Sequence, residues 1–565
     1  MNALIKSIRE SVIGDMQPIE TPFGRKLLVY ADYTASGRAL GFIEDLIREQ
    51  VLPYYANTHT ETSYTGAQTT ALREQARDEI RRAVNAGPDD RVIFCGAGAT
   101  AAVHKLIDIL NLRLPADLNQ RYRLLEQIPP HERPVVFIGP YEHHSNELPW
   151  RESIAELVCI PLDEDGMLDM RALETQLRAH AERPLKIGSF SAASNVTGIK
   201  TDVDAVARLL HRHGALSFWD YAAAAPYVAI DMTGEQTADG DSRKDAVFIS
   251  PHKFIGGPGT PGILVVKQQL LNNTVPAVPG GGTVLYVTPE DHRYLTNAER
   301  SEEGGTPAIV ESIRAGLVFK LQQQVGTEEI ERREADFVRR ALARWSECKN
   351  IEILGPSINN KNAPRLSITS LRFKWRGDDL HYGFVVALLN DLFGIQARGG
   401  CSCAGPYGHA LLGMDMDYSR ALEAQLLEGF MVLRPGWVRL NFNYFIDEET
   451  FEYLVRAVEL VAEHGWRLLP FYRFDEAHGV WRYQDIKTRP AANLANLDFS
   501  QLGTVRTAAE QAQASMSLGE YLAHAERELC RERRGAVRYS LELPAQAEQL
   551  RWFVAPQEVT LAQGL

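Results

Sequence analysis

The most informative stretch of this chain is DAVFISPHK, residues 245–253, in which a short apolar run leads into a polar turn and a lysine. The apolar run predicts a buried strand. The glycine-rich residues 256–262 follow, so Lys253 is expected at the strand exit, between a hydroxyl, an imidazole and flexible backbone. A lysine in that setting can act as a nucleophilic amine.

A second predicted strand exit lies upstream, where Asp220 follows the apolar residues 215–219. Pyridoxal phosphate needs a lysine for its Schiff base and a carboxylate on its pyridine nitrogen, which keeps the ring protonated as an electron sink. Lys253 and Asp220 together therefore predict an enzyme that uses this cofactor. The alternative is a surface lysine and a helix-capping aspartate, since both residue types are common at strand ends.

Two further strand exits carry polar or small residues. Residues 91–95 predict a strand, the small residues 96–100 a tight turn, and residues 101–112 a helix. Such a turn can bind an anion, because free N–H groups and the helix dipole point at it, although many helices begin this way without a ligand. The polar cluster YEHHSN, residues 141–146, follows the predicted strand 135–139 and offers a histidine that could stack on a flat ring or carry protons.

With these residues assembled, the chain resembles the class V aminotransferase superfamily, and within it the second group of cysteine desulfurases and the selenocysteine lyases. The resemblance runs from about residue 28 to about residue 465. It rests on several short motifs in the family's order, which are DYTAS at 32–36, ANTH at 56–59, EHHSN at 142–146 with PW at 149–150, and SNVTG at 194–198.

The resemblance implies a role for each matched residue. His143 would stack on the cofactor ring and Ala222 would pack against it, while Asn195 would lie near the cofactor O3′ and the substrate carboxylate. Asp220 would pair with the pyridinium nitrogen and Lys253 would form the internal aldimine. The phosphate would be held by Ala99, Thr100, Ser250 and His252.

Two more stretches resemble functional loops of that family. EGGTP, residues 303–307, is similar to a loop whose threonine reaches the phosphate of the neighbouring subunit, which implies a homodimer with shared active sites through Thr306. RGGCSCA, residues 398–404, is similar to the loop in which Arg398 clamps the substrate carboxylate and Cys403 takes the sulfur.

The additional Cys401 has no counterpart in the commonest desulfurase loop, but the Cys-x-Cys spacing is similar to that of molybdenum-cofactor sulfurases. One or both cysteines could instead be small turn residues. A zinc site with His409 is conceivable from the ligand types, yet no second Cys/His pair lies nearby, so no metal is expected.

One position departs from the family pattern. The desulfurases usually carry a glutamine three residues after the aspartate, where it donates to the cofactor O3′, whereas this chain has Ala223. An alanine side chain cannot form that hydrogen bond, so another donor must serve, and desulfuration is less strongly implied than pyridoxal phosphate chemistry.

Composition agrees with an enzyme of this class. The 565 residues are 45% hydrophobic, enough for a large core, and no apolar run has the length needed to span a membrane. The net charge of −13 argues against a nucleic-acid binder, whose surface is basic. Residues 1–17 lack a signal-peptide core, and the six cysteines are mostly scattered, so we expect a reducing, cytoplasmic location.

The pattern along the chain predicts an α/β fold. Strands alternate with helices in a large cofactor-binding domain, residues 27–308, which would hold a mostly parallel sheet flanked by helices. An N-terminal segment, 1–26, precedes the large domain, and a smaller α+β domain, 309–465, follows it. Residues 268–298 are expected to be loops and residues 365–369 a strand. A C-terminal extension, 466–565, lies outside the resemblance.

The extension contains a polar middle, residues 493–501, and a predicted helix, 518–534, rich in Arg and Glu. We interpret this helix as a solvated face that packs on the core; a docking surface for a protein sulfur acceptor is the alternative.

These observations predict a cysteine desulfurase-like enzyme that acts on L-cysteine or a related amino acid. Lys253 and His143 would move protons and the Cys403 thiolate would attack the substrate sulfur. The alternatives are an aminotransferase or amino-acid lyase in which Cys403 is idle, or a catalytically retired scaffold that binds the cofactor and a partner protein.

Overall fold

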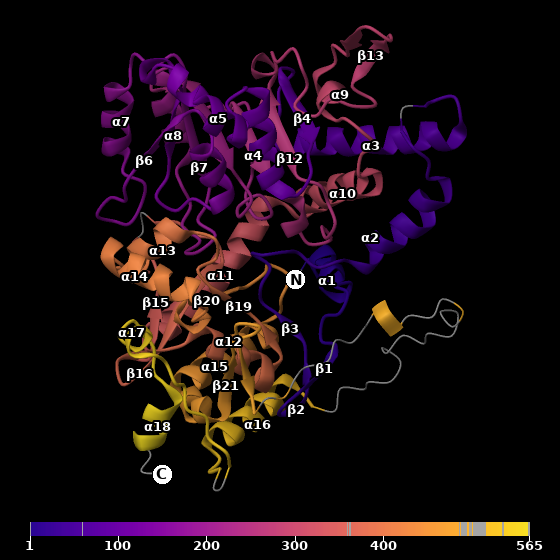
Figure 1. Cartoon of the computed structure of the whole chain (residues 1–565). Coiled ribbons are helices and arrows are strands. Elements are labelled where there is room, and N and C mark those ends of the chain that lie inside the picture. The colour runs from indigo at the N-terminus through magenta and orange to yellow at the C-terminus, as the bar shows by residue number, and fades with distance from the viewer. Residues whose placement is uncertain are drawn as a thin grey trace.

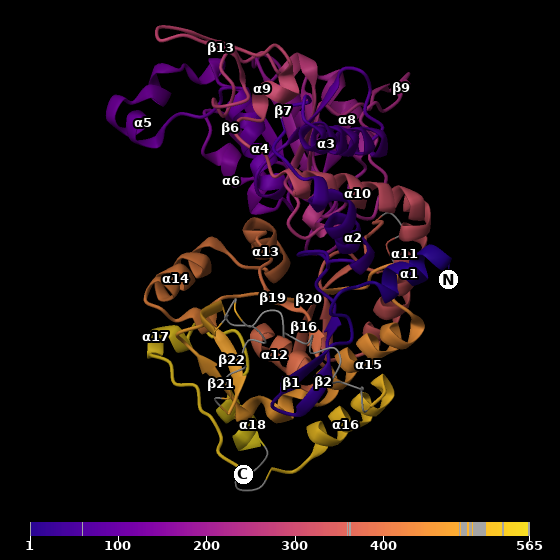
Figure 2. The same cartoon turned by 90° about the vertical axis from the view of Figure 1, so that its right-hand side faces the viewer.

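The computed structural model describes residues 2–58, 60–358, 360, 363–484, 486, 494–496, 500, 516–533 and 536–562. His59, most of the polar segment 493–501 and Arg534, which figured in the sequence analysis, lie outside these ranges. Figures 1 and 2 show a large sheet with its helices in one half of the molecule and a second sheet in the other half.

The large sheet has seven strands in the order β4-β12-β11-β8-β7-β5-β6. β11, β8, β7, β5 and β6 run parallel, whereas β12 is antiparallel to its neighbours β11 and β4. The bounds are β4 Asp90–Phe94, β5 Val135–Ile138, β6 Glu156–Cys159, β7 Lys186–Ser191, β8 Leu216–Asp220, β11 Ala246–Ile249 and β12 Ile263–Lys267. This confirms the predicted α/β class.

Alternate side chains of these strands enter two separate cores, one on each face of the sheet. Phe218 and Phe248 pack with α4 (Gly98–Ile109), whereas Trp219 and Val247 lie in the core that includes α8 (Val203–Arg212). Strands buried on both faces are apolar throughout, which explains the unbroken apolar runs in the sequence. Further helices around this sheet are α3 (Tyr64–Ala83), α6 (Leu148–Arg151), α7 (Met170–Ala179) and α10 (Ile309–Val325).

The second sheet contains β15 (Ile351–Ile353), β16 (Ile368–Trp375), β20 (Trp437–Asn441) and β19 (Arg398–Gly400) in that order, with β17 (Asp378–Leu380) paired to β16. The helices α11 (Thr327–Trp345), α12 (Tyr382–Phe393), α13 (Gly405–Leu412), α14 (Met416–Leu427) and α15 (Glu448–His464) belong to this half. β3 (Val29–Tyr30) pairs with β18 (Ile395–Gln396), so the chain's beginning is tied to the second half. The N-terminal elements α1 (Ala3–Glu10), β1 (Pro18–Thr21), β2 (Gly24–Leu27) and α2 (Gly41–Leu46) precede the large sheet.

Two local expectations were wrong. Residues 268–298 are not all loop, because β13 (Val284–Val287) and β14 (His292–Tyr294) form an antiparallel hairpin, followed by α9 (Ala298–Glu302). The strand expected at 365–369 begins only at Ile368. Lys200 N–H donates to Pro364 O, and Leu366 N–H donates to Gly198 O. These two hydrogen bonds hold residues 364–366 against the large domain instead of in the second sheet.

The described parts of the extension pack on the second half of the molecule. They include β21 (Tyr472–Asp475), β22 (Val480–Tyr483), α16 (Leu518–Cys530), α17 (Ala545–Glu548) and α18 (Pro556–Ala562). α16 contacts α15 and α12, and its buried face includes Tyr521 and Leu529. Within the described ranges, no helix combines the length and the apolar composition that crossing a bilayer requires.

Candidate active site

The predicted site residues meet in one cavity of about 520 Å³ at the carboxyl ends of β7, β8 and β11. This is where ligands bind in open α/β sheets. The wall opposite the sheet comes from the β19 loop of the second domain. Eleven of the twelve predicted site residues line it: Ala99, Thr100, His143, Asn195, Asp220, Ala222, Ser250, His252, Lys253, Arg398 and Cys403.

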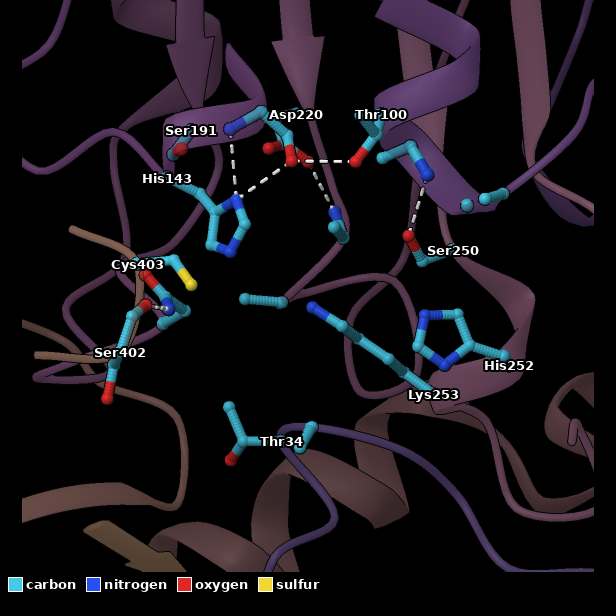
Figure 3. A pocket seen from close by; sticks show the side chains of 18 of the residues that line it. Thr34, Thr100, His143, Ser191, Asp220, Ser250, His252, Lys253, Ser402 and Cys403 are labelled. Atoms are coloured by element: carbon cyan, nitrogen blue, oxygen red, sulfur yellow. Dashed lines mark hydrogen bonds between the residues drawn. The ribbon is translucent and has the colours of Figure 1, made fainter. Parts of the chain in front are cut away.

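Lys253 ends a single turn of 3-10 helix, Pro251–Lys253, that follows β11. Its backbone N–H donates to Ser250 O at 3.1 Å, and Gly257 packs so closely that an added Cβ would lie 2.1 Å from Pro251 O. The turn therefore fixes where the side chain leaves the backbone, and the amine points into the cavity (Figure 3). Burial lowers the pKa of Lys253 to about 8, partly opposed by the Asp220 carboxylate.

Asp220 is the last residue of β8 and is only 4% exposed. Its Oδ1 accepts a hydrogen bond from Ala222 N–H at 2.8 Å. Burial raises the pKa of this carboxyl, while that hydrogen bond and Lys253 oppose the shift. Among the described residues no ion pair engages Asp220, so a cationic ring nitrogen in the cavity would supply the partner that a buried carboxylate needs.

The first turn of α4 forms a cradle suited to an anion. Gly98 has a φ of +56°, and a Cβ there would lie 2.8 Å from Ser250 Oγ, so only glycine fits without displacement. Ser250 Oγ accepts from Ala99 N–H at 2.8 Å, and Thr100 Oγ1 lies 2.7 Å from Ser145 Oγ. Burial lowers the pKa of His252, which lines the same end, to about 4.

His143 lines the cavity, and its ring points into it (Figure 3). Its Nδ1 accepts from Ser145 N–H at 3.1 Å, so the neutral ring carries its proton on Nε2. Burial lowers the pKa of His143 to about 3, and the charge of Lys253 adds to the effect. The ring is therefore neutral at physiological pH, and its Nε2–H has no hydrogen-bond partner among the described residues.

Glu142, the residue before His143, was not singled out from the sequence. It is 3% exposed and accepts from Ser191 N–H at 2.9 Å, Ser191 Oγ at 2.6 Å and Asn146 Nδ2 at 2.7 Å. Burial raises the pKa of Glu142 to about 7 despite these bonds. The carboxyl fastens the histidine segment to the end of β7, which is a positioning role.

Two guanidinium groups that line the cavity share one carboxylate. Arg398 Nε donates to Asp32 Oδ2 at 2.9 Å, and Arg439 Nη2 donates to Asp32 Oδ1 at 3.2 Å. The Arg398 side chain is 54% exposed, whereas that of Arg439 is only 5% exposed. Both arginines line the cavity, and Arg398 is the more accessible of the two to an incoming anion.

Arg439 was missed in the sequence analysis, as was the role of Asp32 as its partner. The available signal was an arginine inside the apolar run of residues 437–440, which begins β20. Charged residues are almost never fully buried unless they are paired, so a buried-strand arginine indicates a carboxylate opposite it.

The loop after β19 holds the Cys403 thiol against the cavity. Ser402 and Cys403 have φ values of 54° and 56°, an unusual conformation for two consecutive non-glycine residues. His144 N–H donates to Cys403 O at 2.8 Å and Asn195 Nδ2 donates to Ser402 O at 2.8 Å, so the large domain holds this strained loop in place. Cys401 does not line the cavity and packs against a buried cluster that includes Ala404, Tyr407 and Trp437.

Thr306 is the predicted site residue that the structure places elsewhere. It is exposed and accepts a weak hydrogen bond from Asn57 Nδ2 at 3.4 Å, in a loop that Glu303 anchors through buried ion pairs with Arg73 and Arg77. Thr306 therefore does not line the cavity.

The cavity fits pyridoxal phosphate on three observations. A lysine amine and a buried carboxylate face it, a glycine-dependent anion cradle closes one end, and two buried polar atoms, Asn195 Oδ1 and Thr34 Oγ1, have no protein partner among the described residues. A polar ligand would satisfy such atoms. No cluster of three or more His, Cys, Asp or Glu side chains suited to a metal occurs in the described part of the chain.

Comparison with known proteins agrees with this geometry. The family described as Aminotransferase class-V matches residues 29–422, more than half of the chain. A probable cysteine desulfurase of Streptomyces coelicolor is 28% identical over 383 residues, which cover 67% of this chain and 84% of that protein. One of Halalkalibacterium halodurans is 29% identical with the same coverage.

Solved structures show the same fold. The cysteine desulfurase of Thermococcus onnurineus, without ligand, superposes with a TM-score of 0.61 at 22% identity over 77% of this chain and 95% of that one. A cysteine desulfurase of Escherichia coli gives a TM-score of 0.58 at 20% identity, with 77% and 94% coverage. The family match ends before the C-terminal extension.

Proposed function

This chain belongs to the aminotransferase class-V family, whose members depend on pyridoxal phosphate, and from that membership we propose that it removes sulfur from L-cysteine or a closely related amino acid. The observation that carries the proposal is that the Lys253 amine and the Cys403 thiol enter one cavity from opposite sides (Figure 3). Two relatives named as probable cysteine desulfurases support it.

Residues of the large domain would hold the cofactor. Ala99, Thr100, Ser250 and His252 suit its phosphate, Asp220 its ring nitrogen, and His143 and Ala222 the two faces of its ring. When bound, the cofactor acts as an electron sink for the amino acid attached to it. Ala223 lines the cavity but offers no donor, so another side chain would have to donate to O3′. Asn195, which lines the same cavity, is the candidate.

The remaining side chains would bind and convert the amino acid. Arg398 would bind its carboxylate in a bidentate manner. The Lys253 amine and the neutral His143 Nε2–H edge would move protons at the substrate carbons. The Cys403 thiolate would attack the substrate sulfur, forming an S–S bond as the C–S bond breaks. Protonation of the released carbon then gives alanine, and the sulfur stays on Cys403 as a persulfide.

An aminotransferase or lyase on this scaffold would leave Cys403 idle. A specific observation favours the desulfurase, because two strained residues and two hydrogen bonds from the large domain hold the thiol at the cavity. Strain of about 1–3 kcal/mol per residue is retained where it serves a function. A retired scaffold would have no need for a lysine and a carboxylate buried face to face.

Cys403→Ser tests the proposal, with Cys401→Ser as the matched control in the same loop. We expect Cys403→Ser to lose sulfide release from L-cysteine by at least about 1,000-fold, because the nucleophile is gone, while the bound visible-absorbing cofactor remains. Cys401→Ser should keep most of the activity. Unchanged sulfide and alanine production by Cys403→Ser would instead favour the lyase or aminotransferase.

We further propose a homodimer in which Thr306 contributes to the partner's phosphate site. Two observations support this proposal. Thr306 is exposed and does not line the cavity of the chain that carries it, and the exposed apolar side chains of Tyr54, Tyr64, Leu285 and Tyr286 could be covered by a second subunit. All six cysteines are free, which suits persulfide chemistry in a reducing compartment such as the cytoplasm. The sulfur would pass to a small thiol or to a protein acceptor.

A further inference from the structure

The C-terminal extension packs its aromatic residues on the start of α12 rather than forming a separate unit. Phe553 pairs with Asp379 as a parallel bridge, and Val554 N–H donates to Asp379 O at 2.8 Å. Trp552 Nε1 donates to Leu433 O at 2.9 Å, next to β20 in the sequence. These contacts hold the indole of Trp552 in a fixed place against the second domain.

His381, directly before α12, links the extension to this helix. Its Nδ1 accepts from Gly383 N–H at 2.9 Å and from Trp481 Nε1 at 3.0 Å, and its Nε2 donates to Val432 O at 3.0 Å. The ring also stacks on Trp552 at 5.4 Å. Burial lowers the pKa of His381 to about 3, so the ring stays neutral and this arrangement does not change near neutral pH.

The next residue, Tyr382, lies between the extension and the strand that carries Arg398. Its ring is nearly parallel to that of Trp552, with a 9° interplanar angle and 6.2 Å between centroids. An added Cβ on Gly399 would lie 2.6 Å from Tyr382 Cδ2, and one on Gly436 would lie 2.9 Å from Cε1. The ring therefore presses on the backbone next to Arg398.

From these contacts we propose that the C-terminal extension positions the active-site loop, residues 398–403, through Trp552 and Tyr382. β19 spans only three residues and pairs with β20 along one edge. The contact of the Tyr382 ring with Gly399 therefore helps to fix the position of Arg398 and the loop. The large domain holds the other side of the loop through His144 and Asn195. Trp552 and Tyr382 are positioning residues, and only the roles of Arg398 and Cys403 rest on the proposed function.

Removal of the indole has a clear structural consequence. A cavity of about 350 Å³ already adjoins Trp552, Met414, Pro435 and Gly436. Trp552→Ala would enlarge it, and the unsupported Tyr382 ring could then move outward, away from Gly399. The side chains around such a void relax only partially, so the β19 backbone would lose its packing contact with the Tyr382 ring.

The test compares Trp552→Ala with Trp466→Ala in the holoenzyme. Trp466 is also half-buried, and its ring stacks on that of Trp375 with 5.4 Å between the centroids. Its Nε1 likewise donates to a backbone oxygen, Glu463 O. No contact of Trp466 with Tyr382 occurs among the described residues, so Trp466 serves as the control. The first readout is the ratio of Cys403 alkylation rates with iodoacetate and iodoacetamide, mapped by peptide mass spectrometry. The second is the split between KM and kcat for L-cysteine.

We expect Trp552→Ala to lower the iodoacetate-to-iodoacetamide ratio at least about threefold, since the anionic reagent senses Arg398 beside the thiol. The KM for L-cysteine should rise about tenfold with a smaller change in kcat. Trp552→Phe, which keeps a flat ring on Tyr382, should restore both values. Cofactor content should stay as in the unmodified protein.

Equal ratios and KM values for Trp552→Ala and Trp466→Ala would overturn the proposal. If Trp552→Ala does not accumulate as folded protein, Trp552→Leu, which keeps apolar volume but no flat surface, replaces it in the same assays with the same expected shifts. Should the unmodified protein release no sulfur from L-cysteine, the alkylation ratio still decides whether the extension positions the loop.

Discussion

Individual residues set the reactivity of the cavity through burial. Lys253 and Asp220 face each other in a site that excludes much water, so the amine loses part of its affinity for a proton while the carboxylate partly restores it. A primary amine is nucleophilic only when neutral. If Lys253 forms the bond to the cofactor aldehyde, its neutral amine would thus be available at a pH where an ordinary lysine is charged.

The rate at which cofactor-free protein takes up pyridoxal phosphate covalently should therefore rise with pH around a midpoint near 8, far below the ordinary lysine value. Stopped-flow absorbance in the visible range between pH 6 and 10 measures it. Borohydride reduction should then fix the cofactor to the Lys253 peptide, and Lys253→Ala should form no covalent chromophore. Recovery of the label on another lysine would refute the assignment.

Most of the residues that line the cavity could be predicted one at a time, because they lie at strand exits within recognisable motifs. Arg439 and Glu142 were not, since their importance comes from partners distant in sequence, Asp32 in one case and Ser191 in the other. Nor could the sequence show that Cys401 and Cys403 face different surroundings, which depends on the positive φ angles of the loop.

At the scale of elements, the start of α4 shows how backbone geometry makes the anion cradle. The sequence predicted a turn at 96–100 and a helix from 101, whereas the helix begins at Gly98, so Ala99 and Thr100 already belong to its first turn. Propensity could not place this start, because it depends on Ser250 accepting the Ala99 N–H from a strand far along the chain.

Gly98→Ala should weaken pyridoxal phosphate binding about tenfold or more, because the added Cβ displaces Ser250 Oγ and strains the positive φ. Gly214→Ala is the matched control, with a φ of +66° and open space around the Cβ. It should lose roughly 1–2 kcal/mol of stability from the backbone alone and keep normal cofactor affinity. Fluorescence titration and thermal unfolding separate the two effects; equal affinities in both variants would argue against the cradle.

The hairpin β13–β14 and the late start of β16 were mispredicted for related reasons. The hairpin lies in a Gly/Pro-rich segment whose composition favours loops, and its side chains Leu285 and Tyr286 are exposed, so it lacks the buried alternation that marks a strand. Residues 365–369 alternate polar and apolar side chains like a strand, but Pro364 and Leu366 bond to Lys200 and Gly198 instead. Tertiary contacts override local pattern in both places.

The whole molecule was predictable as a large α/β domain followed by a smaller one, because unbroken apolar strands and alternating helices are specific to that class. The packing of the extension on α12 was not, since its aromatic residues have no periodic pattern and their partner, His381, lies about a hundred residues earlier. Assembly also belongs to this scale, since Thr306 lies in a loop that Glu303 holds at the surface.

A mixed dimer tests the shared site. Combining Lys253→Ala and Thr306→Ala subunits should give one complete site per heterodimer, since Thr306 of the first serves the lysine of the second. Cofactor content, sedimentation and activity would report it. The control mixture of Lys253→Ala with Thr100→Ala should restore nothing, because Thr100 acts within its own subunit. An active monomer with full cofactor occupancy would rule out the shared site.

Sulfur transfer to Cys403 is the central step of the proposed function. Incubation with L-cysteine carrying ³⁴S, followed by peptide mass spectrometry and amino-acid analysis, measures that transfer directly. We predict a persulfide containing ³⁴S on the Cys403 peptide and alanine formed in step with the transferred sulfur. Pyruvate in place of alanine, or no ³⁴S on Cys403 while the substrate is consumed, would contradict the account.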